Sequence, residues 1–129
     1  MTIKIPVSYG ELIDKLTILD IKKIKISEQK KLENINKEFD LLEESVIEFK
    51  KQNINDYNKF YFDLKEINLK LWEIEDQIRI CEKNKSFDKE FIEFARSVYK
   101  LNDKRFHIKN EINSRFNSSI AEQKDYEEY

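Results

Sequence analysis

The chain has 129 residues, about the size of one typical domain. Charged residues make up 39% of the sequence, against roughly 25% in an average globular protein, and there is only one glycine and one proline. The net charge of -2 creates no field that would attract nucleic acid or anionic lipid. One cysteine cannot form an internal disulfide, and no apolar stretch is long enough to span a membrane. We therefore expect a single cytoplasmic domain over residues 1–129, all-α and with charged outer faces, that has neither nucleic acid nor membrane as a partner.

The first predicted element is a short extended arm over residues 1–7, where apolar and polar residues alternate and Pro6 would interrupt strand pairing. Ser8 stands three residues before Glu11, which is the capping-box pattern at the start of a helix. A helix is therefore predicted from the residue after Ser8, and Ser27 is the candidate for its end. Its apolar positions follow helical spacing, with a lysine in one of them: Leu12, Leu16, Leu19, Lys23 and Ile26.

A second helical pattern covers residues 32–51, either separate from the first helix or continuous with it. One unbroken helix over residues 9–51 would be more than about 60 Å long. Such a helix would overhang the rest of the chain and pair with a second copy, whereas a break near Ser27, which we favour, gives a four-helix bundle. The apolar positions of the second pattern lie on one helical face: Leu32, Ile35, Phe39, Leu42, Val46 and Phe49.

Two further helices are predicted, one capped by Asp56 and ending at the polar stretch 82–88, the other running from Ser86 or Asp88 to about Arg115. Because the loop between them is short, they should form a hairpin. The whole chain is therefore predicted to be an antiparallel bundle of three to four long helices with coiled-coil-like packing. The first apolar seam is unbroken: Phe60, Leu64, Ile67, Leu71, Ile74, Ile78 and Cys81. The second contains one arginine: Phe91, Phe94, Val98, Leu101, Arg105, Ile108 and Ile112.

These seams also predict which side chains are buried. We expect Phe60, Phe91 and Phe94 to be core residues, because all three occupy seam positions. The same position makes Cys81 a buried, inert thiol rather than a nucleophile. The tail at residues 117–129 has no periodicity and is expected to be frayed.

The charged residues near the seams form the candidate binding site. Arg105 occupies a core-type position, and a buried guanidinium needs a carboxylate partner. The candidates for this partner are Asp14, Asp20, Glu73 and Asp76. A structural ion pair is the simpler interpretation, as it is for the favourable i,i+4 pair of Glu75 and Arg79, and a ligand site becomes attractive only if several charged groups meet in one cleft. The full set of candidates is Glu11, Asp14, Lys15, Glu75, Asp76, Arg79, Arg96, Tyr99, Asn102, Asp103, Arg105 and Lys109.

The standard catalytic and metal-binding patterns are missing from the sequence. A single glycine cannot form a glycine-rich phosphate loop, and His107 alone cannot build the paired-histidine sites of helical bundles. We therefore assign no metal site, no cofactor and no catalytic residue.

Three stretches carry a resemblance: VSYGELIDKLTILDIK, LWEIEDQIRICE and ARSVYKLNDKRFHIKNEIN. Over residues 5–113 the chain resembles a family of small bacterial proteins known only as a domain of unknown function. The match is poor over residues 30–58, which indicates that this segment serves as structural scaffold. The resemblance implies a link to envelope polysaccharide metabolism but no mechanism. The ELxxID rhythm is also similar to that of all-helical chorismate mutases. Their first helix carries arginines that bind carboxylates and this one has none, so we reject that interpretation.

Two functions remain open. The leading hypothesis is a non-enzymatic helical interaction or assembly protein that forms a homo-oligomer or binds another protein, including the case of a phage protein that blocks a host target. The alternative is a binding protein or enzyme for a small anionic, phosphorylated metabolite. In either case we expect the site between the first and last helices and the acidic end of the third, where the seams are interrupted.

Overall fold

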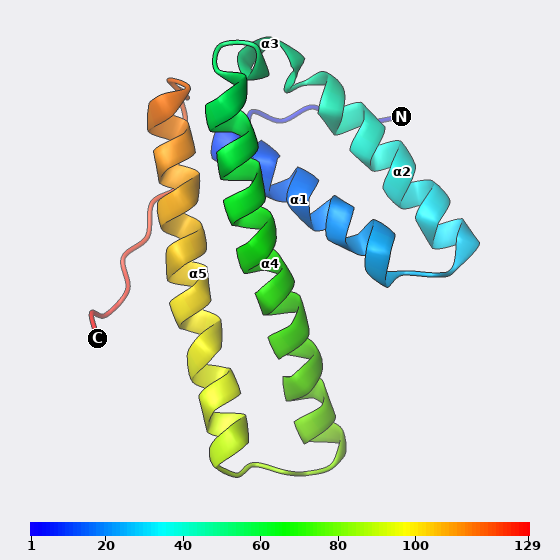
Figure 1. Ribbon diagram of the computed structural model, residues 1–129, viewed down its shortest axis with the longest axis vertical. Helices are drawn as coiled ribbons and strands as arrows, with labels where there is room; N and C mark the ends of the chain where they lie inside the picture. The colour runs from blue at the N-terminus through cyan, green and yellow to red at the C-terminus, as the bar shows by residue number, and fades with distance from the viewer.

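The computed structural model of the protein consists of five helices and no strands, which confirms the all-α prediction (Figure 1). Residues 1–7 lie outside the helices. The helices are α1 (Tyr9–Lys25), α2 (Gln29–Glu44), α3 (Ile47–Lys50), α4 (Ile54–Lys83) and α5 (Lys89–Arg115). None of the five has both the length and the apolar character of a segment that crosses a bilayer.

Local capping signals place several helix ends where the sequence predicted them. The side chain of Ser8 accepts a hydrogen bond from the backbone N–H of Glu11 at 3.1 Å, so α1 begins at the predicted cap. The predicted break near Ser27 is confirmed, because α1 ends before it and α2 starts after it. Asp88 caps α5 by accepting hydrogen bonds from the backbone N–H groups of Glu90 and Phe91.

The connection between α2 and α4 differs from the prediction. The second helical pattern is interrupted at Ser45 and Val46, whose N–H groups bond to carbonyls three residues earlier and so tighten the turn. This turn buries Val46 completely in the core, and α3 follows as a separate single turn. The predicted cap at Asp56 was wrong: Asn53 caps α4, and it accepts the N–H of Asp56 at 3.0 Å. Asp56 lies in the first turn, where a carboxylate is favoured by the helix dipole.

The two longest helices, α4 and α5, lie side by side as a hairpin, and α1 crosses one end of it (Figure 1). α1 packs on both α4 and α5, while α2 packs on the outer side of α1. The main apolar core therefore lies at this end. It comprises Leu12, Ile13, Leu16, Val46, Phe49, Tyr57, Leu64, Ile112 and Phe116.

Beyond the crossing, only α4 and α5 cover each other. We call residues 73–98 the distal hairpin. None of these residues is buried, and the same is true of the whole stretch 69–108. Phe60, predicted to be a core residue, is half-buried and packs against the main core. The prediction that Phe91, Phe94 and Cys81 are core residues was wrong, because these three residues of the distal hairpin are only half-buried. Their seam faces the other helix of the hairpin, but no third element closes over it.

The close approach of α1 to α5 depends on the single glycine of the chain. Gly10 is buried, and its N–H donates to Oδ1 of Asn113 at 2.8 Å. A Cβ atom at this position would lie 2.5 Å from the carbonyl oxygen of Lys109, which is far inside van der Waals contact. Because that oxygen belongs to the backbone of α5, it cannot rotate away, so only glycine fits here.

We predict that Gly10→Ala destabilises the protein by about 1–3 kcal/mol, the usual cost of overpacking. At an unconstrained helical position the same change stabilises by about 1 kcal/mol, so the sign of the effect is the test. Urea unfolding followed by circular dichroism measures the free energy of unfolding. Lys15→Ala, at an exposed position of α1, is the control and should be close to neutral. A Gly10→Ala variant that is more stable than the wild type would contradict the close approach.

Candidate functional site

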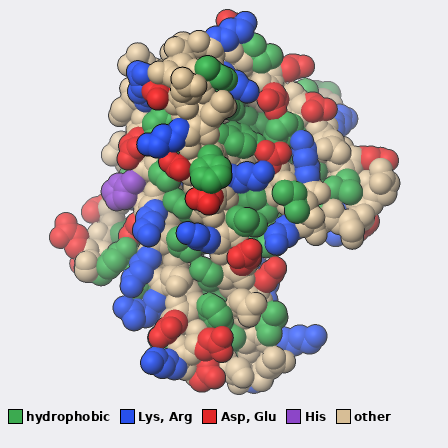
Figure 2. Space-filling model, in the orientation of Figure 1, with side chains coloured by type: hydrophobic (Ala, Val, Ile, Leu, Met, Phe, Trp, Pro, Cys, Tyr) green, Lys and Arg blue, Asp and Glu red, His purple; other side chains and the backbone are tan.

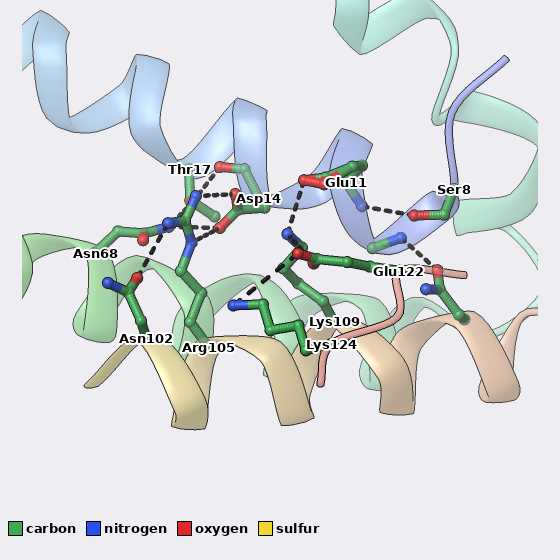
Figure 3. A network of polar contacts seen from close by, with 12 residues as sticks. Ser8, Glu11, Asp14, Thr17, Asn68, Asn102, Arg105, Lys109, Glu122 and Lys124 are labelled. Atoms are coloured by element: carbon green, nitrogen blue, oxygen red, sulfur yellow. Dashed lines mark hydrogen bonds and ion pairs between the residues drawn. The ribbon is translucent and has the colours of Figure 1, made fainter. Parts of the chain in front are cut away.

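An aspartate of α1 pairs with the arginine that interrupts the α5 seam. Nε–H of Arg105 donates to Oδ1 of Asp14 at 2.9 Å, and an Nη2–H donates to Oδ2 at 2.5 Å (Figure 3). This two-point contact is a strong way for a guanidinium to bind a carboxylate. The hydrogen bond to Asp14 also raises the pKa of Arg105 above its ordinary value, so the side chain stays charged. The predicted need for a carboxylate partner is confirmed, and Asp14 is that partner.

Two neighbours hold Asp14 in place, and its side chain is only 4% exposed. The amide nitrogen of Asn68 on α4 donates to Oδ1 of Asp14 and to Oγ1 of Thr17, both at 2.9 Å. The hydroxyl of Thr17 donates in turn to the backbone carbonyl of Asp14 at 2.7 Å. α1, α4 and α5 therefore meet at one hydrogen-bonded cluster (Figure 3).

A second ion pair lies one helical turn away along α5. Nζ of Lys109 lies 2.7 Å from Oε1 of Glu11 and 2.9 Å from Oε2 of Glu122, which belongs to the tail (Figure 3). Burial alone would lower the pKa of Lys109, but its hydrogen bonds to the two carboxylates outweigh that effect and raise it. Lys109 therefore remains charged although it is buried. The tail, expected to be frayed, has no regular secondary structure and contacts α5 through this pair.

The predicted site residues fall into three groups. Those that meet at the crossing are Glu11, Asp14, Asn102, Arg105 and Lys109. Those that lie on α4 beside the crossing are Glu75, Asp76 and Arg79. The predicted i,i+4 ion pair between Glu75 and Arg79 does not form. The third group lies elsewhere: Lys15 pairs with Glu38 of α2, Tyr99 and Asp103 contact Tyr129 of the tail, and Arg96 is exposed.

A cleft of about 460 Å³ lies next to the Asp14–Arg105 pair, and it is lined by α1, α4 and α5. It brings the α4 group of charged residues together with Arg105 and with the only tryptophan, Trp72. A larger hollow of about 860 Å³ lies beside His107 and Arg115, but it is more open and Phe60 is the only apolar side chain in its lining. Because ligand sites are mostly enclosed and apolar, the smaller cleft is the better candidate.

The chemistry available here is recognition of charges and hydrogen-bonding groups. At the crossing, Asp14 compensates the charge of Arg105, Glu11 and Glu122 compensate that of Lys109, and the contacts of Asp14 and Glu11 attach α1 to the hairpin. Arg79, Glu75 and Asp76 keep their charges free for another molecule, because none of them has an ion-pair partner. No three His, Cys, Asp or Glu side chains lie close enough together to hold a metal ion.

Sequence reasoning missed several residues of this site. Asn68 and Thr17 carry no charge, and their only signal was a polar side chain next to an apolar seam. Asn113 ends the third motif stretch, which assigns it no role, and its Oδ1 accepts the N–H of Gly10. Glu122 had no signal at all, because the tail that carries it has no periodic pattern.

We predict that Asp14→Asn destabilises the protein by about 2–3 kcal/mol, because it leaves Arg105 without its counter-charge. This is less than the roughly 3–5 kcal/mol expected for breaking a fully buried pair, since 27% of the Arg105 side chain is exposed. Arg105→Gln alone should cost a similar amount, and the double variant should cost less than the sum. Urea unfolding of all four proteins gives the coupling energy, expected at about 1–3 kcal/mol.

The exposed pair of Lys15 and Glu38 serves as the control for this cycle. Both side chains are about half exposed, so Lys15→Gln and Glu38→Gln should couple by less than about 1 kcal/mol. Strict additivity of the two substitutions at Asp14 and Arg105 would show that the ion pair does not attach α1 to α5.

Two tyrosines hold their protons unusually tightly at the contact between α1 and α4. Burial, followed by the negative charges of Glu43 and Asp20, raises the pKa of Tyr57 above its ordinary value. Burial and a hydrogen bond donated to Asp20 do the same for the pKa of Tyr61. Both phenols therefore stay neutral in the folded protein at a pH where the unfolded chain loses these protons.

We predict that stability falls as the pH rises above about 10, the ordinary pKa of tyrosine, because the folded state then binds more protons than the unfolded state. Tyr61→Phe lowers stability at neutral pH by removing the hydrogen bond to Asp20, yet its stability should decline less steeply above pH 10. Unfolding curves over that range measure the two slopes. Tyr126→Phe, at an exposed tail position, should keep the wild-type slope. Equal slopes for Tyr61→Phe and the wild type would contradict the prediction.

The comparisons with known proteins agree with the resemblance seen in the sequence. No match was found among curated proteins, and none among solved structures. A family model described as a family of unknown function, DUF6165, matches residues 3–129. Since this match covers nearly the whole chain, the protein belongs to the DUF6165 family.

Proposed function

We propose that this protein is a non-enzymatic helical interaction protein of the cytoplasm, and that it assembles with a second copy through its distal hairpin. The observation that carries the proposal is the half-buried seam of the distal hairpin. Apolar residues repeat there with heptad spacing, yet none of them is buried. Sustained heptads stabilise helices when a partner covers them, so a seam that the other helix of the hairpin covers only in part favours association.

The accessible surface of the chain supports this proposal. The surface amounts to 9430 Å² for a mass of 15.7 kDa, whereas a compact monomer of this mass exposes about 7,300 Å². The excess shows that parts of the chain are less covered than in a compact monomer, and the distal hairpin, which has no buried residue, is one of them. A standard interface buries about 800 Å² on each partner, which is less than this excess.

The distal end of the hairpin also has the composition of a contact surface. Ile80, Phe87 and Ile92 are each about half exposed near the loop that joins α4 and α5. Figure 2 shows apolar side chains interspersed among charged ones on this part of the molecule. A partner that covered these residues would remove apolar surface from water, which is the main favourable term in association.

A second copy is the partner that best fits this surface. Two hairpins side by side complete a four-helix bundle, in which each supplies the faces that the other lacks. Residues 73–98 carry seven acidic and five basic side chains, a net charge of -2, so two copies would repel each other only weakly. This net charge is too small to favour a strongly basic partner over a second copy.

Sedimentation equilibrium tests the proposal. We expect the wild type to be a dimer and Ile92→Glu to shift it toward monomer, because a charge at this position would be buried in the interface. Leu41→Glu, at a half-exposed position of α2, is the control and should leave the dimer intact. Circular dichroism checks that both variants remain helical. A wild type that stays monomeric at high concentration would overturn the proposal, and so would a dimer that Ile92→Glu does not weaken.

A further inference from the structure

The cleft beside the Asp14–Arg105 pair contains a hydrogen-bond acceptor that the protein leaves unused. Asn68 is only 5% exposed, and both N–H groups of its amide are engaged by Asp14 and Thr17. Its orientation is fixed, because the carboxylate of Asp14 can only accept and the hydroxyl proton of Thr17 is already donated to a carbonyl. Figure 3 shows the amide nitrogen turned toward these two groups.

The carbonyl oxygen of Asn68 therefore points away from its partners. It accepts no hydrogen bond from the protein, and the side chain lines the cleft. The oxygen itself is not fully enclosed, so it can accept a hydrogen bond from water or from a molecule bound in the cleft. The group that fits is an N–H or O–H of a bound molecule.

The same cleft offers donors for an anionic group. Three of the five N–H groups of Arg105 bond to Asp14 and Asn102, which leaves two unused. Arg79 of α4 also lines the cleft and has no ion-pair partner. A planar guanidinium suits a carboxylate or a phosphate, because two parallel hydrogen bonds can form.

The balance of charges distinguishes between these two anions. Asp14 already neutralises Arg105, so the only uncompensated positive charge in the cleft is Arg79. Glu75 and Asp76 add two uncompensated negative charges to the same lining. A doubly charged phosphate would be repelled by these carboxylates, whereas a molecule with one carboxylate and one ammonium group matches both signs. Half-buried Trp72 and the neighbouring apolar wall suit a compact apolar body.

We propose that this cleft binds a small zwitterion, with a carboxylate and an ammonium group on an apolar body, as in an apolar amino acid. The carboxylate is bound by Arg79 and the free N–H groups of Arg105. The ammonium group donates to Asp76 or Glu75 and to the unused oxygen of Asn68, and the apolar body packs on Trp72. Glu75, Asp76 and Arg79 also belong to the distal hairpin, so this site adjoins the surface proposed for self-association, but binding at it does not require a second copy.

The single tryptophan makes the proposal testable without assigning a spectrum. Its indole N–H gives one signal in a ¹⁵N-correlated spectrum, and that signal reports on the cleft, because Trp72 lines it. We would titrate the full chain with three probes that share one body: L-phenylalanine, 3-phenylpropionate, which lacks the ammonium group, and 2-phenylethylamine, which lacks the carboxylate. L-phenylalanine should shift the signal saturably, and each of the other two should bind at least about tenfold more weakly.

Variants then assign each charge to its residue. Arg79→Gln should weaken L-phenylalanine binding about tenfold and leave 2-phenylethylamine unaffected, because only the carboxylate loses its partner. Asp76→Asn should weaken L-phenylalanine and 2-phenylethylamine but not 3-phenylpropionate. Arg96→Gln and Glu73→Gln are the matched controls, since both positions are exposed on the same helices and lie outside the cleft lining.

Three results would overturn the proposal. The first is the absence of any saturable shift with L-phenylalanine up to its solubility limit. The second is equal binding of the three probes, which would indicate apolar contact without charge recognition. The third is a larger effect of glucose 6-phosphate, which would identify a hydroxylated phosphate as the ligand instead. Repeating the titration with the Ile92→Glu variant, which is expected to be shifted toward monomer, shows whether binding of L-phenylalanine depends on self-association.

Discussion

The crossing of α1 over the α4–α5 hairpin is the constraint on which the rest of the structure depends. Gly10 lets the backbones of α1 and α5 approach closely. Asp14 of α1 then pairs with Arg105 of α5, and Lys109 of α5 pairs with Glu11 of α1. Buried polar groups are costly unless each finds its partner, and the partners here come from three different helices. A different placement of α1 would separate Asp14 from Arg105 and Glu11 from Lys109. Apolar side chains alone would tolerate several placements, so the polar contacts select the one that is observed.

This constraint also divides the molecule into two unlike regions. At the crossing, three helices bury an apolar core and, beside it, the inner part of a polar cluster that includes Asp14 and Asn68. In the distal hairpin only two helices pack, and the seam between them stays open at its sides. The cleft lies where these two regions join. Its lining therefore combines residues with a structural role, such as Arg105 and Asn68, and residues with no structural partner, such as Arg79 and Asp76.

Local features of this fold could be predicted from the sequence because neighbouring residues determine them. The cap at Ser8, the break near Ser27 and the need for a carboxylate beside Arg105 all follow from the chemistry of short segments. The choice of Asp14 among four carboxylates did not follow, because it depends on where α1 crosses α5. Burial of Phe91 was wrongly predicted for a related reason: heptad spacing says which way a side chain faces, but not whether a third helix covers it.

The uneven burial has a consequence for the motions of the protein. Segments with few buried contacts open locally at a lower free energy than the global unfolding of the domain. The amides of the distal hairpin can therefore exchange with solvent through partial separation of α4 and α5, while those around Leu64 and Ile112 exchange only when the whole domain unfolds. A molecule that covered the distal hairpin would remove this difference, so the two ends of α4 would then unfold as one cooperative unit.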